Sequence, residues 1–188
     1  MKRLPMLALA ALLAGCGARE TARSSGDQAT SRAAFLEAYK VFMHPRCVNC
    51  HPSGDAPLQG DDSRIHAQNV QRGPEGKGLL ALKCSACHQE TNTAGLNMPP
   101  GNPNWHLPPP GMPMVFEGRS PRDLAIQLKD PKRNGGKTLA QLLMHVEEDA
   151  LVTGCWNPGD GRAKPPMSHP DFARAMKEWM RTGAEVPE

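Results

Sequence analysis

The residues best suited to chemistry form one short pattern that occurs twice in the 188-residue chain. In each copy, two cysteines three positions apart are followed at once by a histidine. Thiolates and imidazoles bind metals, and paired thiols also form disulfides or take part in redox exchange. A Cys-x-x-Cys pair alone therefore fits several kinds of site. The histidine that follows each pair reduces the number of site types that fit. The two copies are Cys47, Cys50 and His51, and Cys84, Cys87 and His88.

Cys-x-x-Cys-His is the attachment motif of c-type haem. Two thiols at this spacing reach the two vinyl groups on one edge of a porphyrin, and the adjacent imidazole then binds the iron from the proximal side. The chain is therefore predicted to carry two covalent haem c groups. The predicted attachment residues are Cys47, Cys50, Cys84 and Cys87, and the predicted proximal ligands are His51 and His88.

A zinc-binding module is the main alternative for the two cysteine pairs. The usual zinc ribbon has about 15–20 residues between its pairs, whereas the whole segment 51–83 separates Cys50 from Cys84. A ribbon also leaves both histidines without a role. Disulfides or a redox pair are further alternatives, since exported proteins with several cysteines often form disulfides.

The N-terminus has the layout of a secretory signal, with a basic start, an apolar run over residues 4–14 and small residues after it. That run is too short to span a bilayer as a permanent helix. The sequence Leu13-Ala14-Gly15-Cys16 resembles the lipobox of bacterial lipoproteins, which implies acylation of Cys16 and a membrane anchor in the periplasm. A plain secretory signal with a chance cysteine is the alternative.

Three regions are expected along the chain. Residues 1–15 are predicted to be the signal peptide, and 16–30, which are polar, a flexible linker. Residues 31–188 are then one dihaem domain. Its composition is poor in core-forming side chains, with 4% aromatic residues, 18 Gly and 19 Pro, so two porphyrins would supply much of its apolar volume. The net charge of +3 includes the basic signal, and without a basic patch we expect no nucleic-acid binding.

The predicted fold is mainly α, with a few helices and long irregular loops rich in Pro and Gly that wrap two covalent haems. The sequence shows no strand-like alternation of convincing length. An aromatic-bearing helix that runs into Cys-x-x-Cys-His, with an amphipathic helix closing the chain, resembles class I cytochromes c, where the terminal helices pack together. The irregular loops are expected at 52–77 and 92–118. The helices are expected at 31–43, 121–130 after a Ser120 cap, 137–152, and 169–183.

The sixth ligand of each iron determines what each site does, because a filled position favours electron transfer and an open one permits small-molecule chemistry. His66, His106 and His145 are the candidate distal histidines. Met112 and Met114 are the alternative axial ligands, since they lie in a Pro-containing loop about as far after His51 as the methionine ligand of class I cytochromes c. Surface or helix-end roles are expected for His44 and His169, and Cys155 is expected to be a free, buried thiol.

Several longer stretches are similar to a family of exported cytochrome-like proteins labelled isoquinoline 1-oxidoreductase subunit. This resemblance covers nearly the whole mature chain and implies haem binding and electron transfer beside a molybdenum hydroxylase. The stretches include HPRCVNCHPSGDAPLQGDD, CSACHQ, WHLPPP, QLKDPKRNGGKTLAQLLMHV and SHPDF.

The functional hypothesis is a periplasmic electron carrier, rather than an enzyme, that passes single electrons between an exported dehydrogenase and the respiratory chain. A haem enzyme of peroxidase type with one open iron site is an alternative, and a zinc-binding module is another.

Overall fold

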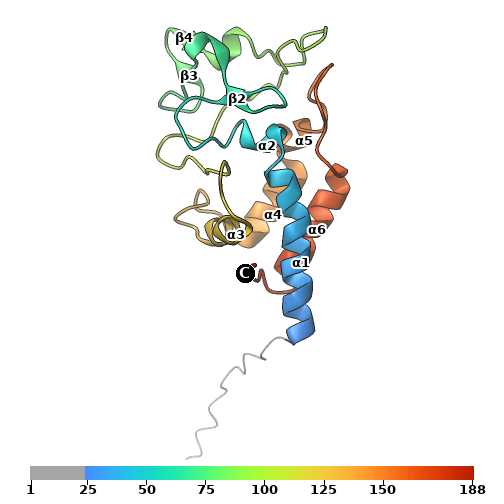
Figure 1. The fold of residues 1–188 in the computed structure, drawn as a ribbon. Helices are drawn as coiled ribbons and strands as arrows, with labels where there is room; N and C mark the ends of the chain where they lie inside the picture. Colours follow the sequence, from blue (N-terminus) through green and yellow to red (C-terminus); the bar gives the residue numbers. More distant parts are fainter. Residues whose placement is uncertain (1–23) are drawn as a thin grey trace, which may run out of the picture.

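Two helices from opposite ends of the chain form the frame of the fold. The computed structural model describes residues 24–188, so the predicted signal peptide and Cys16 lie outside it. Helix α1 (Ser25–Phe42) packs along α6 (His169–Arg181), as Figure 1 shows. The ring centroids of Phe35 and Trp179 are 4.8 Å apart across this contact. The expected packing of the terminal helices is confirmed.

Helix α1 begins six residues before the predicted start at residue 31, inside the predicted linker 16–30, whose C-terminal boundary is therefore wrong. The local cause is a capping pattern. The Ser24 side chain accepts a hydrogen bond from the backbone N–H of Asp27, and the Asp27 carboxylate lies in the first turn, where the helix dipole favours negative charge. Polar residues with good capping chemistry thus extend the helix beyond its apolar stripe.

Three shorter helices, α3, α4 and α5, complete the helical half. Helix α3 (Pro121–Lys129) begins after the Ser120 cap, as predicted. The predicted single helix 137–152 is instead two helices, α4 (Leu139–Glu148) and α5 (Ala150–Gly154). The break is at Asp149, whose extended backbone ends α4 while its side chain accepts hydrogen bonds from the first amides of α5.

The apolar core lies among α1, α3, α4 and α6. Phe42 is at its centre, edge-on to both Phe116 and Phe172 at centroid distances of 5.3 and 5.2 Å. Edge-to-face packing is a favourable arrangement for aromatic rings. The other large buried members of the core are Phe35, Leu124, Leu128, Leu142, Val146, Met176 and Trp179.

The two Cys-x-x-Cys-His motifs lie in the half of the molecule that has little regular structure. The first follows α1 through the short helix α2 (Pro45–Val48). Two antiparallel hairpins come next, β1 (Leu58–Gln59) with β2 (Arg64–Ile65), and β3 (Gly78–Leu79) with β4 (Leu82–Lys83). The 3₁₀ turns are Ala67–Asn69 and Cys84–Ala86, and the second turn opens the second motif. In Figure 1 these hairpins lie at the end of the molecule opposite the start of α1.

The observed architecture is mainly helical, as predicted, and strands are limited to two-residue pairs within residues 24–188. The segment 92–118 has no helix or strand, in agreement with the expected irregular loop. Within residues 24–188, no helix combines the length and apolar character needed to cross a membrane.

Candidate functional site

The two motifs adopt the same kind of tight turn. In the first, the backbone N–H of Cys50 donates to the Cys47 carbonyl at 3.1 Å. In the second, the N–H groups of Cys87 and His88 both donate to the Cys84 carbonyl, at 3.2 and 2.9 Å. Such turns bring both thiols of a motif and its imidazole onto one short stretch of chain, as attachment to a single flat group requires.

The His51 imidazole is fixed by two neighbours from the loop before α3. Its Nδ1 donates to the Met114 carbonyl oxygen at 2.7 Å, and its ring stacks on Phe116 with centroids 3.8 Å apart and planes 11° apart. Burial lowers the pKa of His51 to about 4, against the opposing effect of the hydrogen bond to Met114. The ring is therefore neutral near pH 7, which is the form that binds metals.

The His88 imidazole has the same two kinds of support. Its Nδ1 donates to the Pro100 carbonyl oxygen at 2.7 Å, and its ring stacks on Trp105 with centroids 4.0 Å apart and planes 8° apart. Burial lowers the pKa of His88 as well. Each motif histidine thus has one carbonyl on Nδ1 and one aromatic ring on its face.

These supports were only partly foreseen. The loop 92–118, which contains Trp105, is a segment that the sequence predicts to wrap the cofactors. The stacking of Phe116 on His51 had no signal in the sequence, because Phe116 is 65 positions further along the chain. The two carbonyl partners could not be predicted either, since every residue has a backbone carbonyl.

The three candidate distal histidines share the same nitrogen arrangement. His66 Nδ1 lies 2.7 Å from the Ala67 carbonyl oxygen, His106 Nδ1 lies 2.6 Å from that of Asn104, and His145 Nδ1 lies 3.2 Å from a carboxylate oxygen of Asp149. An oxygen acceptor on Nδ1 requires the proton to be there, so Nε2 keeps a lone pair. All three therefore have the tautomer that a metal ligand needs.

The two remaining histidines, His44 and His169, have different hydrogen-bond partners on their ring nitrogens. His44 caps α2, and its Nδ1 accepts a hydrogen bond from the Arg46 N–H at 3.2 Å. His169 lies in the first turn of α6, and its Nε2 donates to the Val146 carbonyl at 2.8 Å. A neutral His44 carries its proton on Nε2, and His169 has its Nε2 occupied. Both lie at helix starts, and neither is predicted to bind iron.

The two alternative axial methionines lie in different surroundings, and only Met114 contacts His51. Met114 supplies the carbonyl that holds His51 Nδ1, and its side chain packs against the apolar core. Met112 lies beside the turn at Gly135, between α3 and α4. The backbone of Met114 therefore supports the proximal imidazole, which leaves its thioether poorly placed for the opposite side of the same ring.

All cysteines of the described chain are free thiols, so none of the pairs is a disulfide here. Burial raises the pKa of Cys50 to about 12, and a hydrogen bond with Cys155 together with burial raises the pKa of Cys47. Cys155 also donates to the Arg46 carbonyl at 3.3 Å. Cys155 is thus a partly buried thiol beside the first motif, close to what was expected. Between residues 24 and 188, no three or more His, Cys, Asp or Glu side chains are grouped to hold a metal ion.

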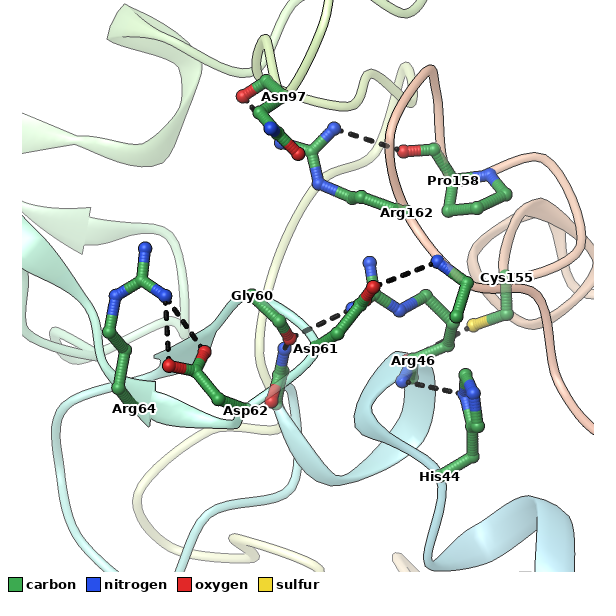
Figure 2. Close-up of polar contacts among 12 residues, drawn as sticks. His44, Arg46, Gly60, Asp61, Asp62, Arg64, Asn97, Cys155, Pro158 and Arg162 are labelled. Atoms are coloured by element: carbon green, nitrogen blue, oxygen red, sulfur yellow. Dashed lines mark hydrogen bonds and ion pairs between the residues drawn. The ribbon is translucent and has the colours of Figure 1, made fainter.

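A polar network holds the first motif to the chain segments around the second. Figure 2 shows the Arg46 guanidinium donating to the Gly60 carbonyl and to Asp61, at 2.8 and 2.6 Å. Asp61 in turn accepts from the backbone of Ala163 at 3.0 Å. The preceding residue, Arg162, donates to the Asn97 carbonyl at 2.7 Å. Asp61 and Arg162 together connect the start of the first motif to the loop after the second.

Large apolar side chains are exposed around the second motif. Leu80, at the tip of the hairpin just before Cys84, is 89% exposed, Leu96 is 73% exposed, and Ile65 is 71% exposed. Ile65 adjoins His66 in the sequence, and Leu80 and Leu96 are each eight residues from His88. Exposed apolar side chains mark a binding place when they form one contiguous patch.

Comparisons with protein-family models, with curated proteins and with solved structures found no significant match to this chain. The arrangement of the residues themselves therefore carries the functional argument.

Proposed function

We propose that this chain is a dihaem c-type cytochrome that passes single electrons between an exported dehydrogenase and the respiratory chain. One observation carries the proposal. Two Cys-x-x-Cys-His turns, far apart in sequence, each present a histidine with Nδ1 on a backbone carbonyl and one face on an aromatic ring. A hydrogen bond from Nδ1 to a carbonyl fixes the tautomer and raises the basicity of Nε2, as in metal-bound histidines.

The residues present fit a covalent haem at each motif. The cysteines are free thiols, as thioether formation requires, and the exposed Ile65, Leu80 and Leu96 are the kind of surface that a porphyrin covers. The Arg46 Nε, next to Cys47, is buried with no hydrogen-bond partner in the described part of the chain. Haem propionates are carboxylate acceptors of the type that a guanidinium binds.

Each residue type would have a defined part in such a site. Cys47 and Cys50, and likewise Cys84 and Cys87, would hold the rings through thioether bonds, with His51 and His88 binding iron through Nε2. A c-type haem supplies an iron centre that gains and loses one electron. The stacked Phe116 and Trp105 would keep the two imidazoles in fixed planes and exclude water from one face of each. Nothing in this arrangement calls for a catalytic side chain.

Candidates for the distal position are His66, His106 and His145, with Met112 and Met114 as alternatives. The placement of Met114 on the His51 side of its site favours the histidines. His145 is near enough to His51 for its charge to lower the pKa of that imidazole. A low-spin iron with two protein ligands suits electron transfer, whereas the peroxidase alternative needs one open position.

Location and partner follow from the N-terminal sequence and the family resemblance. The signal peptide and the lipobox-like Cys16 support export and anchoring on the periplasmic side of a membrane. The similarity to proteins labelled isoquinoline 1-oxidoreductase subunit supports a molybdenum hydroxylase as the redox partner. Both are part of the proposal.

The mass of the mature protein tests the haem count. Expressed in a host competent in cytochrome maturation, the purified full chain should carry two haem additions, roughly 1.2 kDa in all, plus the acyl group on Cys16. The double variants Cys47→Ser/Cys50→Ser and Cys84→Ser/Cys87→Ser should each lose one addition. Cys155→Ser, which alters a thiol beside the first motif, is the matched control and should keep both.

Other outcomes separate the alternatives. A colourless wild type with unmodified thiols would refute the haem proposal, and one equivalent of bound zinc in its place would support the zinc-binding module. If both haems are present but one binds carbon monoxide in the wild type, the site is open and the peroxidase-type enzyme is favoured over the carrier.

A further inference from the structure

The rings of His66 and His88 lie close together although their residues are 22 positions apart. Their centroids are separated by 6.3 Å, with 63° between the ring planes. With a metal–imidazole bond of about 2 Å and about 1.2 Å from nitrogen to ring centre, two imidazoles on opposite sides of one iron have centroids about 6.4 Å apart. In that geometry, rotation of one ring about the line through the two bound nitrogens leaves the centroid distance unchanged. The distance is therefore compatible with any angle between the ring planes.

The two imidazoles do not form a hydrogen bond with each other. Neighbouring neutral imidazoles readily form an N–H···N hydrogen bond, but here each Nδ1 donates to a backbone carbonyl, of Ala67 for His66 and of Pro100 for His88. Both rings therefore keep an Nε2 lone pair, and no hydrogen bond to either Nε2 is found among residues 24–188. Two neighbouring imidazoles that each keep an Nε2 lone pair supply the donor atoms that a shared Lewis acid requires.

The backbone around His66 is held in an unusual conformation. Ser63, Gln68 and Asn69 all have positive φ angles, 49°, 62° and 53°, although none is glycine. Each such residue costs about 1 kcal/mol or more, and clusters of them are typical of segments that clamp a ligand. The hairpin of β1 and β2 thus presents His66 in a defined position despite having only two residues in each strand.

We propose that His66 and His88 are the two axial ligands of one iron, that of the haem attached through Cys84 and Cys87. This assignment rests on the proposed function and adds to it the pairing of ligands at the second motif. It makes this site bis-histidine and coordinatively filled. A bis-histidine iron has a lower potential than a His/Met iron in comparable surroundings.

The test is spectroscopic and uses the intact dihaem protein. In wild type, near-infrared magnetic circular dichroism should show bis-imidazole ligation for at least one ferric haem. The variant His66→Ala should keep two covalent haems by mass, convert one of them to high spin, and bind one carbon monoxide per chain in the ferrous state. Added imidazole should restore the low-spin spectrum.

Two further variants keep the assignment testable. His169→Ala, the loss of a histidine whose Nε2 already donates to the Val146 carbonyl, is the control and should leave both haems low-spin. His66→Met, which preserves a ligand, should remain low-spin with a raised potential for one haem, and it substitutes for His66→Ala if that variant does not fold.

The results separate failure of the pairing from failure of the proposed function. Two haems in wild type with unchanged low-spin spectra in His66→Ala would overturn the pairing alone, as would the same change of spin state in the control His169→Ala. Absence of haem from wild type would overturn the proposed function itself.

Discussion

At the scale of single residues, the histidines show how far chemistry can be read from a sequence. The sequence proposed five of the seven histidines as iron ligands, two from the motif spacing and three from their places in loops or on a helix, and set His44 and His169 aside. All five have Nδ1 on an oxygen acceptor and a free Nε2, and the other two do not. Their binding to iron stays a prediction, but their tautomers agree with it. The proximity of the His66 and His88 rings had no sequence signal, because the two residues are 22 positions apart.

The stacking of Phe116 on His51 leads to a prediction at this scale. Phe116→Leu should lower the free energy of unfolding by about 1–3 kcal/mol, through the lost aromatic contacts and a small cavity. It should also shift the reduction potential of one haem, because the His51 ring loses its fixed plane. Urea denaturation and a redox titration of the holoprotein measure the two effects.

Phe172→Leu is the matched control for that experiment. Phe172 packs edge-on to Phe42 at nearly the same distance as Phe116 does, but the structure records no contact between it and His51. It should lose similar stability and leave both potentials unchanged. Equal shifts of potential in the two variants would show that the stack on His51 has no specific effect.

At the scale of helices and loops, capping residues were the most informative part of the sequence. Ser120 and Ser168 begin α3 and α6 where they were expected to. The single helix predicted over 137–152 is wrong at Asp149. Its neighbours are apolar with helical spacing, and periodicity does not reveal that a side chain can bind the backbone amides that follow it. Its side chain bonds to Leu151 and Val152, which starts a new helix.

The double capping role of Asp149 leads to the second prediction. Asp149→Ala should lower the free energy of unfolding by about 1 kcal/mol, because the first amides of α5 lose their acceptor. Asp149→Asn keeps a side-chain oxygen and should lose much less, although it removes the carboxylate 3.2 Å from His145. Urea denaturation compares them. An equal loss in both variants would mean that charge, rather than capping, is what Asp149 contributes.

At the scale of the whole molecule, the helical frame was predictable and the loops around the motifs were not. The meeting of α1 and α6 follows from two amphipathic patterns at the ends of the chain. The loops have no such periodicity, and their order depends on long-range polar contacts. Buried Arg72, for example, joins the carbonyls of Gly54 and Pro108 at 3.0 and 2.6 Å. No property of an isolated arginine in a sequence predicts that role.

The buried hydrogen bonds between α1 and the C-terminal segment lead to the third prediction. Ser31, fully buried, donates to the Trp179 carbonyl at 2.9 Å and accepts from the Glu185 N–H at 3.0 Å. Ser31→Ala should lower the free energy of unfolding by about 1–3 kcal/mol, because the Glu185 N–H loses its acceptor. The visible spectrum should not change, since this contact is in the helical half.

Ser25→Ala is the control, because Ser25 is exposed at the start of the same helix. It should change stability by less than about 0.5 kcal/mol. Thermal or urea unfolding measures both variants. A loss for Ser31→Ala no larger than that for Ser25→Ala would show that the buried serine does not secure the two ends of the chain.

The supports of the two motif histidines lie at very different distances along the polypeptide. Pro100 is 12 residues after His88, whereas Met114 is 63 residues after His51. Closing a short segment costs less chain entropy than closing a long one. If the chain is exported from its N-terminus, as we propose, we therefore expect the downstream motif to reach its folded form first, with the upstream motif waiting for the loop that contains Met114.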